Sequence, residues 1–188
     1  MNKYIKGSLK VLTNYCTFMI IFAVFLSMLI GIARENFISW LPVYSGAIFF
    51  LMMLVLYSDM KSIAVKEKRP QYNLSPYPFK GFILGVLGFS PFILLQLIYP
   101  LINLDNPLAA RIKHLALNTL LGPVYVFIRL VGDLGGGAIA AYAIASLTIP
   151  VIAMFGYMAG FYGIELGAYY RKLFRKADNT GARSNPKK

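Results

Sequence analysis

Hydrophobic residues in this chain are concentrated in long runs that contain no charged side chain. Four such runs cover residues 11–32, 40–58, 81–104 and 138–163. A helix needs about 20 apolar residues to cross the hydrocarbon layer of a membrane, and each run has roughly that length. The pattern therefore predicts an all-α integral membrane protein in which a single domain, residues 1–168, contains four transmembrane helices.

One further hydrophobic segment, residues 106–133, differs from the four runs because it also contains ionisable groups. Drawn as a helix at 100° per residue, it collects its polar side chains in one narrow stripe. The stripe consists of Arg111, His114, Asn118, Tyr125, Arg129 and Asp133. Gly122-Pro123 interrupts the segment, and a proline inside a helix removes a backbone donor and clashes with the carbonyl four residues earlier. We predict an amphipathic helix with a kink at this dipeptide.

The polar stripe is the candidate ligand site, because side chains of this kind could line a cavity for an anionic or polar molecule. An alternative is a helix at the membrane surface, whose polar groups face water and whose long basic side chains reach lipid phosphates. A second alternative is a segment that dips into the membrane and returns at Gly122-Pro123. Such a dip is tolerable only if other helices bury it, since lipid cannot hydrogen-bond the exposed backbone.

The distribution of basic residues along the chain indicates whether it has four or five spans. The chain has 19 Lys and Arg against 7 Asp and Glu. With four spans, the amino terminus, residues 59–80 and the carboxyl-terminal tail share one side. That side then holds every base except Arg34, Arg111, Lys113 and Arg129. A fifth span would move the basic tail across the membrane, against the enrichment of Lys and Arg in cytoplasmic segments. We expect four spans in the cell membrane and both termini in the cytoplasm.

The two most basic segments outside the runs are expected to lack regular structure. Residues 59–80 contain five bases and Pro70, Pro76 and Pro78, which predicts a solvated, irregular loop. The polar tail, residues 169–188, is expected to be disordered. Because these bases lie between or beside apolar runs, anionic lipid head groups are the expected partner, and nucleic acid is not.

Glycines spaced four residues apart predict close contacts between helices. Gly81 and Gly85 form one such pair, and Gly156 and Gly160 form another. Small residues let two helix backbones approach, which replaces the hydrophobic driving force that is missing inside lipid. We expect these four glycines to lie at helix-packing positions.

Composition argues against most enzyme chemistry. Hydrophobic residues make up 58% of the chain and charged residues only 14%, against about 25% in a typical soluble domain. A single cysteine, Cys16, and a single histidine exclude an internal disulfide and a site built from several histidines or cysteines. No nucleotide-binding, hydrolase or metalloprotease motif is present. We therefore expect no metal, no cofactor and no catalytic residue.

These observations favour a non-enzymatic multi-pass membrane protein, such as an accessory or assembly subunit of a membrane complex. It would associate with a membrane-protein partner or with further copies of itself. The alternative is a small carrier or channel that uses the polar stripe of residues 106–133. A membrane enzyme acting on lipid is the third hypothesis, and one histidine without a spaced pair of carboxylates supports it poorly.

Overall fold

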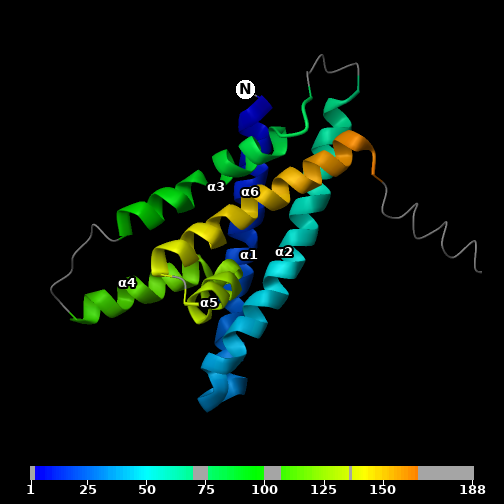
Figure 1. Cartoon of the computed structure of the whole chain (residues 1–188). Coiled ribbons are helices and arrows are strands. Elements are labelled where there is room, and N and C mark those ends of the chain that lie inside the picture. The colour runs from blue at the N-terminus through cyan, green and yellow to red at the C-terminus, as the bar shows by residue number, and fades with distance from the viewer. Residues whose placement is uncertain (1–2, 70–75, 100–106, 136, 165–188) are drawn as a thin grey trace, which may run out of the picture.

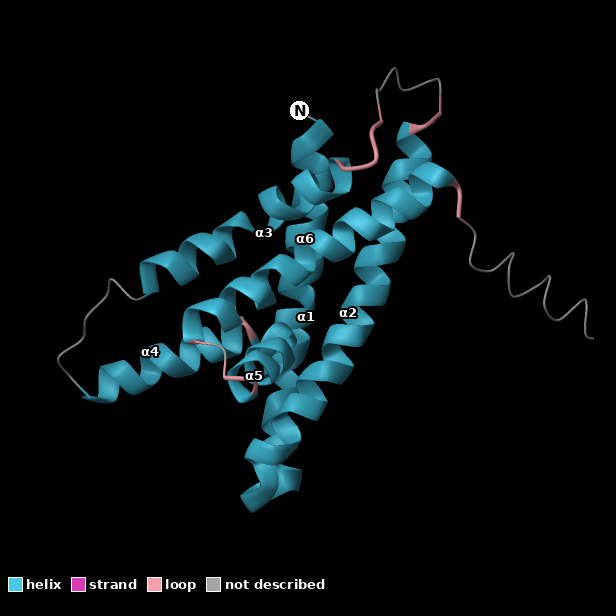
Figure 2. Cartoon of the chain, viewed as in Figure 1, coloured by secondary structure: helices cyan, strands magenta, loops and turns pink. Residues whose placement is uncertain are grey.

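The computed structural model describes residues 3–69, 76–99, 107–135 and 137–164, and its elements in these ranges are all helical (Figure 2). Four helices are long and apolar enough to cross a membrane. These are α1 (Lys3–Ala33), α2 (Phe37–Glu67), α3 (Lys80–Ile98) and α6 (Ala138–Tyr162). The predicted all-helical fold with four such helices is confirmed.

Shorter elements connect the long helices. The 3-10 turn η1 (Arg34–Asn36) joins α1 to α2. Between α3 and α6, the chain forms α4 (Pro107–Leu120), the 3-10 turn η4 (Gly122–Val124) and α5 (Tyr125–Asp133). The predicted kink at Gly122-Pro123 is therefore a complete break of the helix.

The four long helices meet at one end of the bundle (Figure 1). The first residues of α1 and α3 and the last residues of α2 and α6 gather at what we call the amino-terminal end of the bundle. The turn η1 lies at the opposite end, where α1 and α2 form a hairpin that extends beyond the other helices. Helix α6 runs between α2 and α3 and packs against both.

Glycines explain how closely α6 approaches its neighbours. A Cβ atom on Gly156 would lie 2.7 Å from the carbonyl oxygen of Tyr57 in α2, and one on Gly160 would strike Lys61. On the other side, a Cβ atom on Gly85 of α3 would lie 2.6 Å from the Cα atom of Pro150. Gly81 faces Tyr157 and Ala153 in the same way. All four glycines thus lie where two backbones nearly touch, and only a residue without a side chain fits there.

Two predicted boundaries are wrong. Helix α2 continues to Glu67, so the first part of the predicted loop 59–80 is helical. Met, Lys, Ala and Glu in this stretch are good helix formers, and nothing before Pro70 ends the helix. Helix α1 likewise begins at Lys3, eight residues before its apolar run. The predicted disordered tail and the last part of the third predicted span lie outside the described residues.

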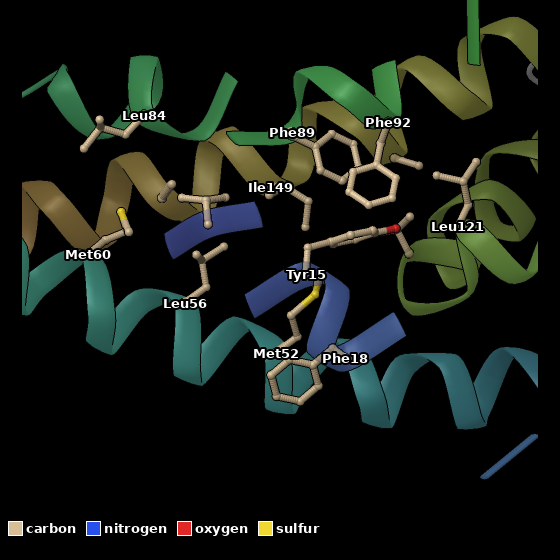
Figure 3. Close-up of a cluster of buried hydrophobic side chains, with 14 of the residues drawn as sticks. Tyr15, Phe18, Met52, Leu56, Met60, Leu84, Phe89, Phe92, Leu121 and Ile149 are labelled. Atoms are coloured by element: carbon tan, nitrogen blue, oxygen red, sulfur yellow. The ribbon is translucent and has the colours of Figure 1, made fainter. Parts of the chain in front are cut away.

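Aromatic side chains fill the core between α1 and α3 (Figure 3). Tyr15 of α1 is buried, and its ring centroid lies 4.8 Å from that of Phe89 and 4.5 Å from that of Phe92, with edge-on geometry in both cases. Such pairs add about 0.5–1.5 kcal/mol beyond the burial of their surface. The Tyr15 hydroxyl points toward the chain around Leu121.

Candidate functional site

The break between α4 and α5 is buried in the bundle and its backbone is hydrogen-bonded. Residues Leu121–Val124 are buried, and η4 packs against α1 and α2. The hydroxyl of Ser45 in α2 donates to the Gly122 carbonyl oxygen at 2.7 Å and accepts from the Val126 N–H at 3.1 Å. The hydroxyl of Tyr15 donates to the Leu120 carbonyl oxygen at 3.0 Å. Two of the long helices thus supply hydrogen-bond partners for backbone groups that the break leaves without a helical partner.

The break contacts α1 near the middle of its apolar run. The ring of Phe22 packs directly on Gly122, where a Cβ atom would collide with it. Phe22 is the middle residue of the apolar run 11–32. From the break, the nine residues of α5 extend about 14 Å and pack against α6 and α2.

The break divides the predicted polar stripe between α4 and α5. Arg111 and His114 belong to α4, but their side chains lie outside the described part of the chain. Asn118 is exposed and Tyr125 is half-buried. On α5, the Arg129 Nε atom donates to both carboxylate oxygens of Asp133 at 3.2 Å.

The Arg129–Asp133 pair is a surface pair in this chain. Both side chains are exposed, and the Asp133 carboxylate, followed by the Tyr125 hydroxyl, raises the pKa of the Arg129 guanidinium. Of the stripe residues whose side chains are described, Asn118, Arg129 and Asp133 are exposed and Tyr125 is half-buried.

The best-defined polar cluster is one that the sequence pattern did not predict. The Lys80 ammonium lies 2.7 Å from the Glu67 Oε2 atom, and the Tyr157 hydroxyl donates to the same oxygen at 2.6 Å. All three residues are buried. Lys80 is the first residue of α3, Glu67 is the last residue of α2, and Tyr157 belongs to α6. We call these three residues the buried triad.

The fourth long helix also reaches the buried triad. The Lys80 ammonium lies 5.0 Å from the ring centroid of Tyr4 in α1, which is a cation–π distance. One lysine thus joins all four long helices at the amino-terminal end. Opposite charges on either side of a short connection between two apolar runs are the signal that could have revealed this pair. The bases of residues 59–80 instead suggested a solvated loop.

Other polar groups between the helices also pair with each other. Asp59 of α2 accepts from Lys10 and Asn14 of α1, both at 2.8 Å. Ser146 of α6 and Gln96 of α3 lie 2.6 Å apart. At the end of α6, Lys61 and Lys68 of α2 donate to the carbonyl oxygens of Ile164 and Phe161. Lysine ammonium groups at this position also interact favourably with the negative end of the helix dipole.

No group of three or more metal-binding side chains occurs within the described ranges. Comparison with known proteins gives no relative for the chain, since no family model, no curated protein and no solved structure matches it.

Proposed function

We propose that this chain is a non-enzymatic multi-pass membrane protein that serves as an accessory or assembly subunit of a membrane complex. The supporting observation is how its interior polar groups are used. The buried triad joins α2 to α3 and α6, Ser45 and Tyr15 hold the break, and Asp59 joins α2 to α1. Polar groups that link helices make a rigid scaffold, whereas a catalytic site or a transport path needs polar groups that face a substrate.

We assign the partner subunit to the end of the α1–α2 hairpin that contains η1, which lies opposite the amino-terminal end of the bundle. It extends beyond the other helices of the bundle (Figure 1). Large apolar side chains are exposed there on both helices, namely Met28, Ile32, Ile38, Trp40 and Val43. A neighbouring membrane helix would bury these side chains and complete the packing of the hairpin. We place the protein in the cell membrane with both termini in the cytoplasm, in agreement with its distribution of bases.

Site-specific photo-crosslinking in native membranes tests this assignment. A photoreactive residue at Ile32 or Val43 is expected to form one recurrent protein adduct. The same residue at Met52, which is 1% exposed and faces the core, serves as the matched control and should form none. If both hairpin positions gave only lipid adducts, and the chain were isolated alone in nanodiscs made directly from native membranes, the assembly role would be wrong.

A small carrier is the second candidate. The position of the break, near the middle of the apolar run of α1, favours it. Carriers often bind their substrates near the middle of the membrane, where broken helices present free backbone groups. Here the free groups of the break are bonded to Ser45 and Tyr15, so a substrate would have to displace these two side chains. A stabilising ligand whose thermal shift disappears in Ser45→Ala, while the variant stays folded, would favour the carrier.

A further inference from the structure

A polar contact between α3 and α6 leaves one buried donor without a partner. The Ser146 hydroxyl donates to the Oε1 atom of Gln96 at 2.6 Å and lies 2.8 Å from the Tyr142 carbonyl oxygen. Ser146 is buried, and so is the Nε2 atom of the same Gln96 amide. Within the described residues, this Nε2 atom has no hydrogen-bond partner. Buried amide donors are nearly always paired in folded proteins, so this one points to a further acceptor at its position.

The same turn of α6 contains a backbone acceptor that has lost its usual donor. Pro150 lies inside α6, and a proline has no N–H to donate to the carbonyl oxygen four residues earlier, which is that of Ser146. The hydroxyl groups of α6 nearby do not replace this donor. Thr148 donates to the Ala145 carbonyl oxygen at 2.6 Å, and the Ser146 hydroxyl faces Gln96 and the preceding turn.

Helix α3 shows how such a carbonyl group is paired elsewhere in the chain. Pro91 lies inside α3 and removes the usual donor of the Leu87 carbonyl oxygen. The Ser90 hydroxyl donates to this oxygen at 2.8 Å. The residue before Pro150 is Ile149, whose side chain has no donor. The Ser146 carbonyl oxygen therefore has room for a donor from outside its own helix.

The Gln96 amide and the Ser146 carbonyl group point toward the same end of the bundle. Side chains of a helix lean toward its first residue, and its carbonyl groups point toward its last residue. The first residue of α3 and the last residue of α6 both lie at the amino-terminal end (Figure 1). Because the hydrogen bond between Ser146 and Gln96 places these residues side by side, the donor and the acceptor face the same region between α3 and α6.

We propose that one water molecule is bound in this region, where it accepts from the Gln96 Nε2 atom and donates to the Ser146 carbonyl oxygen. Water fits because the site offers one donor and one acceptor. The amide hydrogens would repel a cation, and the carbonyl oxygen would repel an anion. Buried water molecules typically bond to polar groups that lack other partners. This water ties the turn of α6 at Pro150 to α3, and the site does not depend on the assignment of a partner subunit.

Solid-state NMR of the full chain in lipid bilayers tests the proposal directly. The chain has two glutamines, Gln71 and Gln96, so Gln71→Ala leaves a single glutamine to label with nitrogen-15. We expect magnetisation to pass from water to the Gln96 side-chain amide several times faster than to the Gln96 backbone N–H, which is bonded within α3. Equal transfer to the two nitrogens would overturn the proposal, and so would an amide that donates to the Ser146 hydroxyl instead of to water.

Three variants in the same background identify the partners of the water. Pro150→Ala restores a backbone donor to the Ser146 carbonyl oxygen, so transfer to the Gln96 side chain should fall to the level of the backbone. Ser146→Ala removes the hydroxyl but keeps this carbonyl group, so the transfer should persist. Thr148→Val is the matched control, because the Thr148 hydroxyl donates to Ala145 of its own helix, and the transfer should again persist.

A stability measurement separates a water-bound amide from an unpaired one. In Ser146→Ala the bond from the hydroxyl to Gln96 is already absent, so adding Gln96→Met removes only what Nε2 binds, at nearly constant volume. We expect the melting temperature in detergent to fall by about 2–4 °C, the effect of roughly one lost hydrogen bond. An unpaired amide would give a rise instead, because its burial would no longer be unfavourable.

The outcomes that would overturn the proposal are therefore distinct. They are persistent water transfer in folded Pro150→Ala, loss of the transfer in folded Thr148→Val, and a rise in melting temperature when Gln96→Met is added to Ser146→Ala. Circular dichroism establishes which variants are folded. If Pro150→Ala does not fold, the stability measurement decides, because it leaves the proline in place.

Discussion

Lys80 and Glu67 form a buried ion pair, 2.7 Å apart, between the first residue of α3 and the last residue of α2. The pair therefore holds the end of α2 against the start of α3. Tyr157 of α6 donates to the same carboxylate oxygen, so the position of α6 depends on the pair as well.

Removing one partner of the buried pair should be more harmful than removing both. Glu67→Gln leaves the buried Lys80 ammonium without its counter-charge, and such a change costs about 3–5 kcal/mol. Lys80→Gln strands the carboxylate in the same way. We expect Glu67→Gln with Lys80→Gln to be clearly more stable than the sum of the two single changes, as measured by unfolding in detergent. Additive effects would mean that the two charges do not act on each other.

Ser45 should be required for the break between α4 and α5. Ser45→Ala removes the partner of the Val126 N–H and one of the two donors to the Gly122 carbonyl oxygen, which still accepts from the Tyr125 N–H, and a buried group without a partner costs about 1–3 kcal/mol. Ser27→Ala is the matched control, because the Ser27 hydroxyl is exposed and donates only to Val24 of its own helix. We expect the melting temperature to fall for Ser45→Ala alone. An equal fall for both variants would contradict the role given to Ser45.

Even one methyl group should disturb the contact between α6 and α2. In Gly156→Ala the new Cβ atom meets the Tyr57 carbonyl oxygen at 2.7 Å, and forcing such a contact apart costs about 1–3 kcal/mol. Gly132→Ala in α5 is the control, since no atom lies within 4 Å of its added Cβ. Alanine is the better helix former by roughly 1 kcal/mol, so this control should be neutral or stabilising. Thermal unfolding of both variants in detergent measures the difference, and similar melting temperatures would remove Gly156 from the contact.

Neutralising the pair on α5 should have little effect. Arg129 and Asp133 are both exposed, and solvent screens their attraction. Asp133→Asn and Arg129→Gln should each leave the melting temperature nearly unchanged, and the double variant should equal their sum. A strong loss in Asp133→Asn that Arg129→Gln restores would show that the pair is buried against something in the membrane. The stripe Arg111, His114, Asn118 and Tyr125 would then again be the place to look for a ligand.

The sequence predicts the helices well because the length of an apolar run is a local property. The run 138–163 corresponds closely to α6, which is Ala138–Tyr162, and the helix over residues 106–133 is interrupted at Gly122-Pro123 as predicted, although Pro42, Pro91 and Pro150 lie inside unbroken helices. The ends of α1 and α2 were less predictable, since charged residues that are good helix formers extend a helix beyond its apolar run without a change of pattern. Helix length and span length are therefore different quantities here.

The polar contacts could not be predicted from spacing. Ser45 bonds to residues 77 and 81 positions away along the chain, and Tyr157 bonds to Glu67 from 90 positions away. A serine inside an apolar run looks the same whether it bonds to its own helix, as Ser27 does, or supports another segment. The stripe on residues 106–133 was visible because it follows helical spacing, yet the structure divides it between α4 and α5 and leaves Asn118, Arg129 and Asp133 exposed. Only the arrangement of the helices distinguishes these cases.

The central claim is that four helices cross the membrane while the segment from α4 to α5 enters and leaves on the same side. Cysteine accessibility in intact cells tests it most directly, in a background in which Cys16 is replaced by serine. With a membrane-impermeant maleimide, we predict labelling of cysteines placed at Asn36 and Leu134, and protection of cysteines placed at Lys66 and Ser184 until the cells are opened. Labelling at Ser184 from outside while Lys66 stays protected would show an odd number of spans and contradict the account.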